Sequence, residues 1–331
     1  LTSSTSANSV RLDSDATTLN ISGSENLTLA VASTVLNLTT VIDASDATGA
    51  VTLAHDHTTA ATGVTITGGS GNDSLTLSGT NTATDTVSGG AGNDTITFST
   101  DLADADVING GDGTDKLIGD DGQLAGLTTA NNVSNVEVLQ ASTVLETTLT
   151  TANVDSSIKS VTLAAGASAG TVTFGAGSNT LGMGTASAGA LTVNDTGLAT
   201  TDTLTINAST VDSFNDNSVA INGFETVNFN TGTGSTTDEQ DISTFNVTGD
   251  PDSAGLRTAV TLNISGKGNF HTSGIITLGT DGSGTGTIDA TGLTGTLVMD
   301  AATAGATTIT GGSGNDTILG DSHASTLTGG A

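Results

Sequence analysis

Four glycine-rich loops, each ending in an acidic residue, contain the side chains best suited to bind a metal ion. Glycine permits tight turns in which backbone carbonyls converge on one point, and a terminal aspartate adds negative charge. This pattern predicts a site for a hard cation that prefers oxygen ligands. The loops comprise Gly68, Gly69, Ser70, Gly71, Asn72 and Asp73; Gly89, Gly90, Ala91, Gly92, Asn93 and Asp94; Gly110, Gly111, Asp112, Gly113, Thr114 and Asp115; and Gly311, Gly312, Ser313, Gly314, Asn315 and Asp316.

Calcium is the cation that this ligand set favours. Ca²⁺ accepts about six to eight oxygens in a flexible geometry, whereas Mg²⁺ requires a tighter octahedron and keeps its waters. Because one loop cannot supply a full shell, we expect ions to be shared between consecutive loops. Asp73 and Asp94 would then surround one ion, and Asp94 and Asp115 the next.

Three aspartates outside the loops are further candidate ligands. Asp85 and Asp106 each lie four residues before a loop. A carboxylate at that position either reaches the ion or caps a turn, and the sequence leaves both roles open. Asp321 follows the fourth loop and is included among the candidates.

The four histidines give a weaker metal signal. His55 and His57 would share one face of a strand, a spacing compatible with a transition metal. No third ligand is evident in the sequence, which favours a solvated turn there. His271 and His323 stand alone, and we expect both at the surface.

Internal repetition indicates that the loops stack. The first three loops begin at residues 68, 89 and 110, which are 21 residues apart. The segment Thr18–Gly23 recurs at 261–266, and each copy lies 50 residues before a Gly-Gly-Ser-Gly-Asn-Asp loop. A weaker echo pairs residues 114–117, leading to 135–138, with residues 201–204, leading to 224–227. Such periods are typical of solenoids, in which each repeat packs on the next.

Apolar and polar residues alternate in short segments along the chain, which is the period of β-strands. Only residues 120–132 and 145–154 resemble helices, and we expect short turns there. The sequence therefore predicts an all-β protein, an elongated parallel β-roll or β-solenoid with right-handed crossovers. We expect segments at 1–67, 68–120, 121–249, 250–310 and 311–331, with breaks near 120 and 250.

Charge excludes several classes of partner. Five lysines and arginines face 34 aspartates and glutamates, which gives a net charge of −29. Nucleic acid and anionic lipid would be repelled, and divalent cations attracted. No run of 18 apolar residues predicts a membrane span, and the absence of cysteine excludes a disulfide scaffold. The ends, Leu1 and Thr328–Ala331, suggest a fragment of a longer protein.

Signatures of catalysis are weak. Residues 166–170 fit Gly-x-Ser-x-Gly, but strand-like residues follow where a nucleophile elbow requires a helix. No His-Glu-x-x-His motif occurs, which excludes that class of zinc protease. We therefore expect a protein that is not an enzyme.

The four loops resemble the RTX nonapeptide repeats of proteins exported by bacterial type I secretion. The match is closest at Gly311–Asp321, where the pattern Gly-Gly-x-Gly-x-Asp leads into an apolar strand residue. The tandem nine-residue repetition of long RTX blocks is missing, so we expect fewer ions. The wider layout is similar to calcium-dependent surface-layer proteins of Gram-negative bacteria, the Caulobacter type in particular.

That resemblance implies a secreted structural protein that folds outside the cell with calcium. It implies self-association into a two-dimensional lattice, often hexameric, on lipopolysaccharide. The alternatives are an RTX adhesin stalk and a carbohydrate-acting enzyme on a β-helix. Two-dimensional crystals on adding calcium would favour the surface layer, an extended monomer the adhesin, and sugar cleavage the enzyme.

Overall fold

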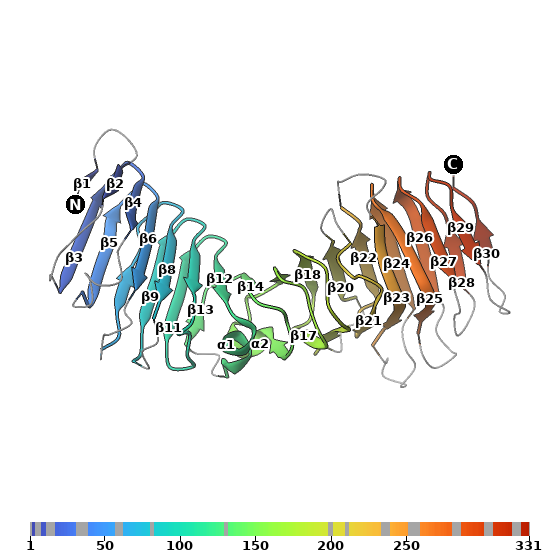
Figure 1. The fold of residues 1–331 in the computed structure, drawn as a ribbon, viewed down its shortest axis with the longest axis horizontal. Helices are drawn as coiled ribbons and strands as arrows, with labels where there is room; N and C mark the ends of the chain where they lie inside the picture. The colour runs from blue at the N-terminus through green and yellow to red at the C-terminus, as the bar shows by residue number, and fades with distance from the viewer. Residues whose placement is uncertain are drawn as a thin grey trace. The chain divides into compact units, whose positions relative to one another are not determined.

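The fold is known from a computed structural model, and it is built almost wholly from parallel β-strands (Figure 1). The structure describes residues 2–3, 8–10, 17–30, 39–56, 62–79, 83–128, 132–197, 201–208, 212–232, 239–250, 259–279, 286–300, 307–319 and 326–330. Contacts divide the chain into two compact units. The first comprises Leu1–Ser142 and Ala152–Ile158, and the second comprises Thr143–Thr151 and Lys159–Ala331.

The first unit alternates strands between two parallel sheets, so that odd-numbered strands form one sheet and even-numbered strands the other, each in chain order. The odd strands are β1 (Thr2–Ser3), β3 (Thr18–Gly23), β5 (Val41–Ala47), β7 (Thr65–Thr67), β9 (Thr86–Ala91), β11 (Val107–Asp112) and β13 (Val133–Ser134). The even strands are β2 (Asn8–Val10), β4 (Leu27–Ala30), β6 (Val51–Asp56), β8 (Ser74–Ser78), β10 (Thr95–Phe98), β12 (Lys116–Gly119) and β14 (Val138–Ala141).

The second unit repeats this arrangement. Its odd strands are β15 (Thr148–Thr150), β17 (Gly170–Phe174), β19 (Leu191–Asp195), β21 (Asn217–Asn222), β23 (Glu239–Thr248), β25 (Asn269–Leu278), β27 (Leu297–Asp300) and β29 (Thr317–Leu319). Its even strands are β16 (Ser160–Leu163), β18 (Ser178–Met183), β20 (Thr203–Asn207), β22 (Thr226–Asn230), β24 (Val260–Gly266), β26 (Gly286–Leu293), β28 (Thr307–Thr310) and β30 (Thr326–Thr328). The predicted parallel β-solenoid is confirmed.

Strand register follows the 21-residue repeat. Ile96 in β10 is paired with Leu75 in β8 and with Leu117 in β12. All three side chains are buried, while the threonines and serines between them lie closer to solvent. Each coil therefore places its apolar residue directly on that of the previous coil, which is how alternation in the sequence becomes a continuous core.

Phenylalanine provides the largest core contacts. All seven phenylalanines are fully buried. Four of them form one cluster in the second unit, with ring centroids 5.0–6.1 Å apart and mostly edge-to-face geometry: Phe214, Phe229, Phe245 and Phe270. Such pairs add stability beyond the area they bury, which partly offsets the scarcity of large side chains elsewhere.

Two short helices, α1 (Asp121–Gly126) and α2 (Thr151–Val154), lie within the two stretches predicted to be helical, and that prediction is confirmed. Helix α1 begins with a capping box: Gln123 N donates to Asp120 Oδ1 at 2.7 Å, and Asp120 N donates to Gln123 Oε1 at 3.3 Å. Among the described residues, neither of the two helices could span a bilayer. The five predicted segments stay a prediction, since the compact units divide at other residues.

Candidate calcium-binding loops

The first three glycine loops lie on one edge of the first unit, where an odd strand turns into the next even strand. The second loop leaves β9 and enters β10, and the third leaves β11 and enters β12. Strands β9 and β11 are paired so that Gly90 lies beside Gly111. The equal spacing in the sequence thus becomes a column of equivalent loops, and we call this the loop edge.

Glycine is required at the loop edge by backbone conformation and by space. Gly90 and Gly111 have φ values of +107° and +110°, which side chains rarely tolerate. A Cβ at Gly111 would collide with the carbonyl oxygen of Gly90, and a Cβ at Gly90 with that of Gly69. Consecutive coils therefore bring their loop carbonyls together, as a site with oxygen ligands requires.

The terminal aspartates of the loops form a ladder along the same edge. Asp73 N donates to Asp94 Oδ1 at 2.7 Å, and Asp94 N donates to Asp115 Oδ1 at 2.7 Å. Asp115 N donates in turn to Glu137 Oε2 at 2.8 Å. Glu137 was not among the predicted ligands, because it follows no glycine loop and lies 22 residues after Asp115, one more than the 21 that separate the loop aspartates.

For the two aspartates in the middle of the ladder, only one carboxylate oxygen accepts a hydrogen bond. Oδ2 of Asp94 and Oδ2 of Asp115 are buried and accept no hydrogen bond. Each points at the first glycine of its own loop, where a Cβ would collide with it: Asp94 at Gly89, and Asp115 at Gly110. A buried carboxylate oxygen without a partner is costly, and a calcium ion would satisfy it. The residues therefore fit calcium.

Burial raises the pKa of the loop aspartates. For Asp94 the pKa rises to about 7, because desolvation outweighs the hydrogen bond from Asp73 N, and the charges of Asp73 and Asp115 add to the rise. The pKa values of Asp73 and Asp115 are also raised, chiefly by burial. Without a cation, this column of carboxylates resists ionisation.

The remaining positions of the loops support the turns. Asn93 N donates to Asn72 Oδ1 at 2.8 Å, and Thr114 N donates to Asn93 Oδ1 at 2.9 Å, which forms a second ladder at the surface. Ser70 and Asp112 are exposed, and Asp112 contributes its backbone carbonyl, which accepts a hydrogen bond from Gly92 N. The other members of the predicted set at this edge, Gly68, Gly71, Ala91 and Gly113, lie in the same column of turns.

The fourth loop repeats this geometry in the second unit. Leu297 N donates to Asp316 Oδ1 at 3.0 Å, as Val51 N donates to Asp73 Oδ1 at 2.7 Å. Asp316 Oδ2 accepts no hydrogen bond, and a Cβ at Gly311 would collide with it. Gly311, Gly312 and Ser313 line a pocket, together with Gly329 and Gly330. Gly314 has no room for a Cβ against Gly295 O, and Asp321 lies outside the described residues.

Asp85 and Asp106 lie at the opposite turns of the coils, where an even strand leads into the next odd strand. Val64 N donates to Asp85 Oδ1, and Asp85 N donates to Asp106 Oδ1, both at 2.8 Å. Asp106 Oδ2 accepts a further hydrogen bond from Ala103 N at 2.8 Å. Both carboxylates thus accept hydrogen bonds from backbone amides at turns other than the glycine loops, and their role as ligands or as turn caps stays a prediction.

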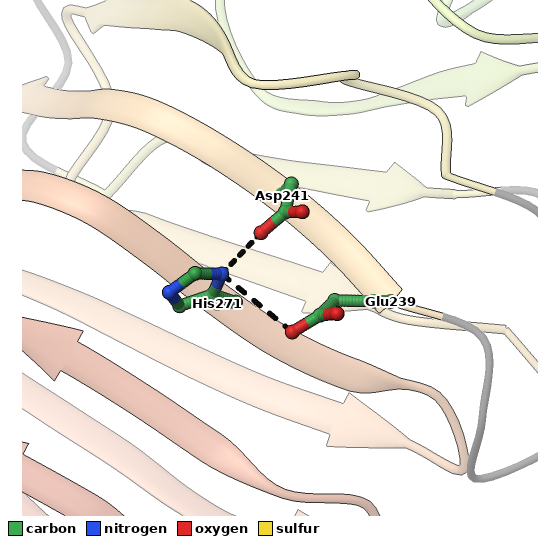
Figure 2. A group of neighbouring side chains, drawn as sticks. All are labelled: Glu239, Asp241 and His271. Carbon is green, nitrogen blue, oxygen red and sulfur yellow. Dashed lines mark hydrogen bonds and ion pairs between the residues drawn. The ribbon is translucent and has the colours of Figure 1, made fainter.

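Two of the expectations for histidine were wrong. His55 is buried in β6 and does not lie in a solvated turn; His57 and His323 lie outside the described residues. Figure 2 shows that His271 does not stand alone, since its Nδ1 contacts Asp241 Oδ1 and lies 3.5 Å from Glu239 Oε1. The parallel register that pairs Asp241 in β23 with His271 in β25 brings them together.

This fold and this column of loops define a calcium-binding β-solenoid. Comparison with known families agrees, because four stretches of the chain, residues 64–81, 79–97, 100–123 and 302–331, match the RTX calcium-binding nonapeptide repeat. These stretches of the chain thus carry RTX nonapeptide repeats, which are calcium-binding repeats. No curated protein and no solved structure was found to match it.

Proposed function

We propose that this chain is part of a secreted structural protein of the bacterial cell surface, which folds and self-assembles into a surface layer when it meets calcium. The observation that supports this most is the buried ladder of Asp73, Asp94 and Asp115. Among the described residues, no lysine, arginine or histidine forms an ion pair with these three carboxylates. Where calcium is scarce, that ladder opposes folding; where calcium is abundant, it holds the coils together.

The same switch suits export by a type I secretion system, since an exported chain must stay unfolded until it leaves the cell. RTX repeats occur in secreted proteins, and the net charge of −29 keeps the calcium-free chain expanded through self-repulsion. We propose that lateral self-association produces a two-dimensional lattice, hexameric in the form that the resemblance suggests, above lipopolysaccharide. We propose no catalytic role for the chain.

Electron microscopy of the purified chain, before and after calcium is added, tests this proposal. The surface-layer function predicts ordered two-dimensional arrays that appear with calcium and disperse with EGTA. Extended monomers at every calcium concentration would support an adhesin stalk and would refute the surface layer. Release of reducing sugar from surface polysaccharide would refute the absence of catalysis.

A further inference from the structure

A second group of carboxylates lies in the second unit, far along the chain from any glycine loop. One carboxylate oxygen from each of Asp195, Asp202 and Asp250 lies within 4.8 Å of one from each of the others. Asp195 ends β19, Asp202 precedes β20, and Asp250 follows β23. These turns lead from odd to even strands, as the turns of the loop edge do in the first unit. We call this group the Asp195 cluster.

Asp202 points a buried oxygen into the cluster. Its side chain is 2 % exposed, and Gly177 N donates to its Oδ1 at 2.6 Å. Its Oδ2 is buried and accepts no hydrogen bond. No lysine, arginine or histidine among the described residues forms an ion pair with Asp195 or Asp202. An ionised carboxylate buried in this way lacks a compensating positive charge.

The coil between the members of the cluster contributes a glycine, which lets Asp195 and Asp250 approach each other. Gly223 lies in the turn between β21 and β22, with φ at +86°. A Cβ there would lie 3.1 Å from Asp195 Cβ and 3.1 Å from Asp250 Oδ1. A larger residue at this position would press against both Asp195 and Asp250. The glycine of the middle coil therefore allows the acidic groups of the coils on either side to come within 4.8 Å of one another.

The hydrogen bonds around Asp202 repeat those around Asp115. Asp202 N donates to Glu225 Oε2 at 2.9 Å, just as Asp115 N donates to Glu137 Oε2 at 2.8 Å. The weak echo in the sequence thus corresponds to the same ladder contact in both units. Burial raises the pKa of Asp195 to about 6 despite a backbone hydrogen bond from Gly197; the Asp202 carboxylate, which can accept a hydrogen bond from protonated Asp195, and the charges of Asp202 and Asp250 add to the rise. Burial likewise raises the pKa of Asp94 in the glycine loops when no cation is bound.

We propose that Asp195, Asp202 and Asp250 bind a divalent cation, calcium in the extracellular setting, at a site that lacks the Gly-Gly-x-Gly-x-Asp motif. The ligands are all carboxylate oxygens, a set that suits calcium better than zinc or copper, which favour imidazole and thiolate ligands. The ion ties the coil of β19 and β20 to the coil of β23 and β24 across the coil between them. This inference does not depend on the surface-layer function.

Equilibrium dialysis of the full chain against ⁴⁵Ca²⁺ at pH 7.5 tests the proposal. Asp202→Asn keeps the oxygen that accepts from Gly177 and removes the charge, so the chain should bind one calcium ion fewer. Glu146→Gln removes an equal charge from an exposed position of the same unit and should leave the count unchanged. Millimolar Mg²⁺ should not displace the ion, because Mg²⁺ holds its waters more strongly.

A second variant controls for the possibility that the first one fails to fold. Asp195→Asn alters a less buried member of the cluster and should remove the same single ion, and the double variant should remove no more than one. Circular dichroism in calcium should show unchanged strand content in each. If both single variants bind as many ions as the original chain, the proposal is wrong. An unchanged count with a raised melting temperature would identify a cluster of carboxyl groups that share protons.

Discussion

Replacement of Asp94 by asparagine should change stability in opposite directions with and without calcium. The asparagine can keep its oxygen on Asp73 N and place its amide where the unpartnered Oδ2 now lies. In EGTA, the variant escapes the cost of ionising a buried carboxyl group. In calcium, it loses a ligand that we place in two shared sites. Few other substitutions are expected to stabilise the chain without calcium and to destabilise it with calcium.

The magnitude in EGTA follows from the pKa of Asp94. Ionisation at pH 7.5 of a group whose pKa has risen from 3.8 to about 7 costs at most about 4 kcal/mol. Partial solvation of the turn reduces that figure to about 2 kcal/mol. Asp94→Asn should therefore raise the melting temperature in EGTA by roughly 4–8 °C in a unit of this size.

The magnitude in calcium follows from binding linkage. At free calcium about 100-fold above the dissociation constant, each occupied site contributes about 2.7 kcal/mol. Weakening two shared sites removes up to about 5 kcal/mol, so the variant should melt below the original chain. Differential scanning calorimetry under both conditions measures the two shifts.

Asp85→Asn is the matched control, since Asp85 Oδ1 accepts a backbone hydrogen bond in the same way at the opposite turns. Its effect should be independent of calcium. A change of sign at Asp85 as well would show that those turns also bind calcium, which the sequence left open. Equal destabilisation by Asp94→Asn in calcium and in EGTA would refute the account of the ladder.

Four further predictions test separate parts of the structure. In calcium titrations, Asp94→Ala should lower the affinity more than Asp73→Ala, because only Asp94 serves two shared sites; equal effects would contradict ion sharing. Gly111→Ala should destabilise the chain by at least about 3 kcal/mol and weaken calcium binding, whereas Gly126→Ala, which meets open space, should be neutral or stabilising by denaturant melts. Phe229→Ala should cost about 3–5 kcal/mol, because Phe229 contacts three other rings of its cluster, and an unchanged urea midpoint would contradict this. In EGTA, the melting temperature should fall as pH rises from about 4 to about 7, because the folded chain binds more protons than the unfolded chain at Asp94; calcium should abolish this slope, and a rise with pH would contradict it.

The sequence predicted the fold well because the same local rule repeats in every coil. Alternation placed Leu75, Ile96 and Leu117 inward, and the constant spacing of 21 residues placed them on top of one another. The glycine loops could also be predicted from the sequence, because Gly90 and Gly111 have positive φ values and lie against carbonyl oxygens, where no other residue fits. In repeats of this kind, local pattern and tertiary contact coincide.

The contacts that the sequence did not predict depend on register between coils of unequal length. The coils of the second unit differ in length, so Asp195 and Asp250 meet across Gly223 without any fixed spacing between them. The pairing of His271 with Asp241 likewise depends on which residues of β23 and β25 lie opposite one another, and no repeated spacing in the sequence fixes that register. A motif search finds ligands that recur along the chain, whereas these groups become visible only when the strands are placed side by side.

The most direct test of calcium-dependent folding is circular dichroism of the purified chain, with metal content measured on the same samples. After exhaustive EGTA treatment, the β signal should weaken and the melting temperature should fall, and calcium should restore both where magnesium does not. Calcium should then remain bound after gel filtration. An identical spectrum, an identical melting temperature and no retained calcium would show that the glycine loops do not hold the coils together through an ion.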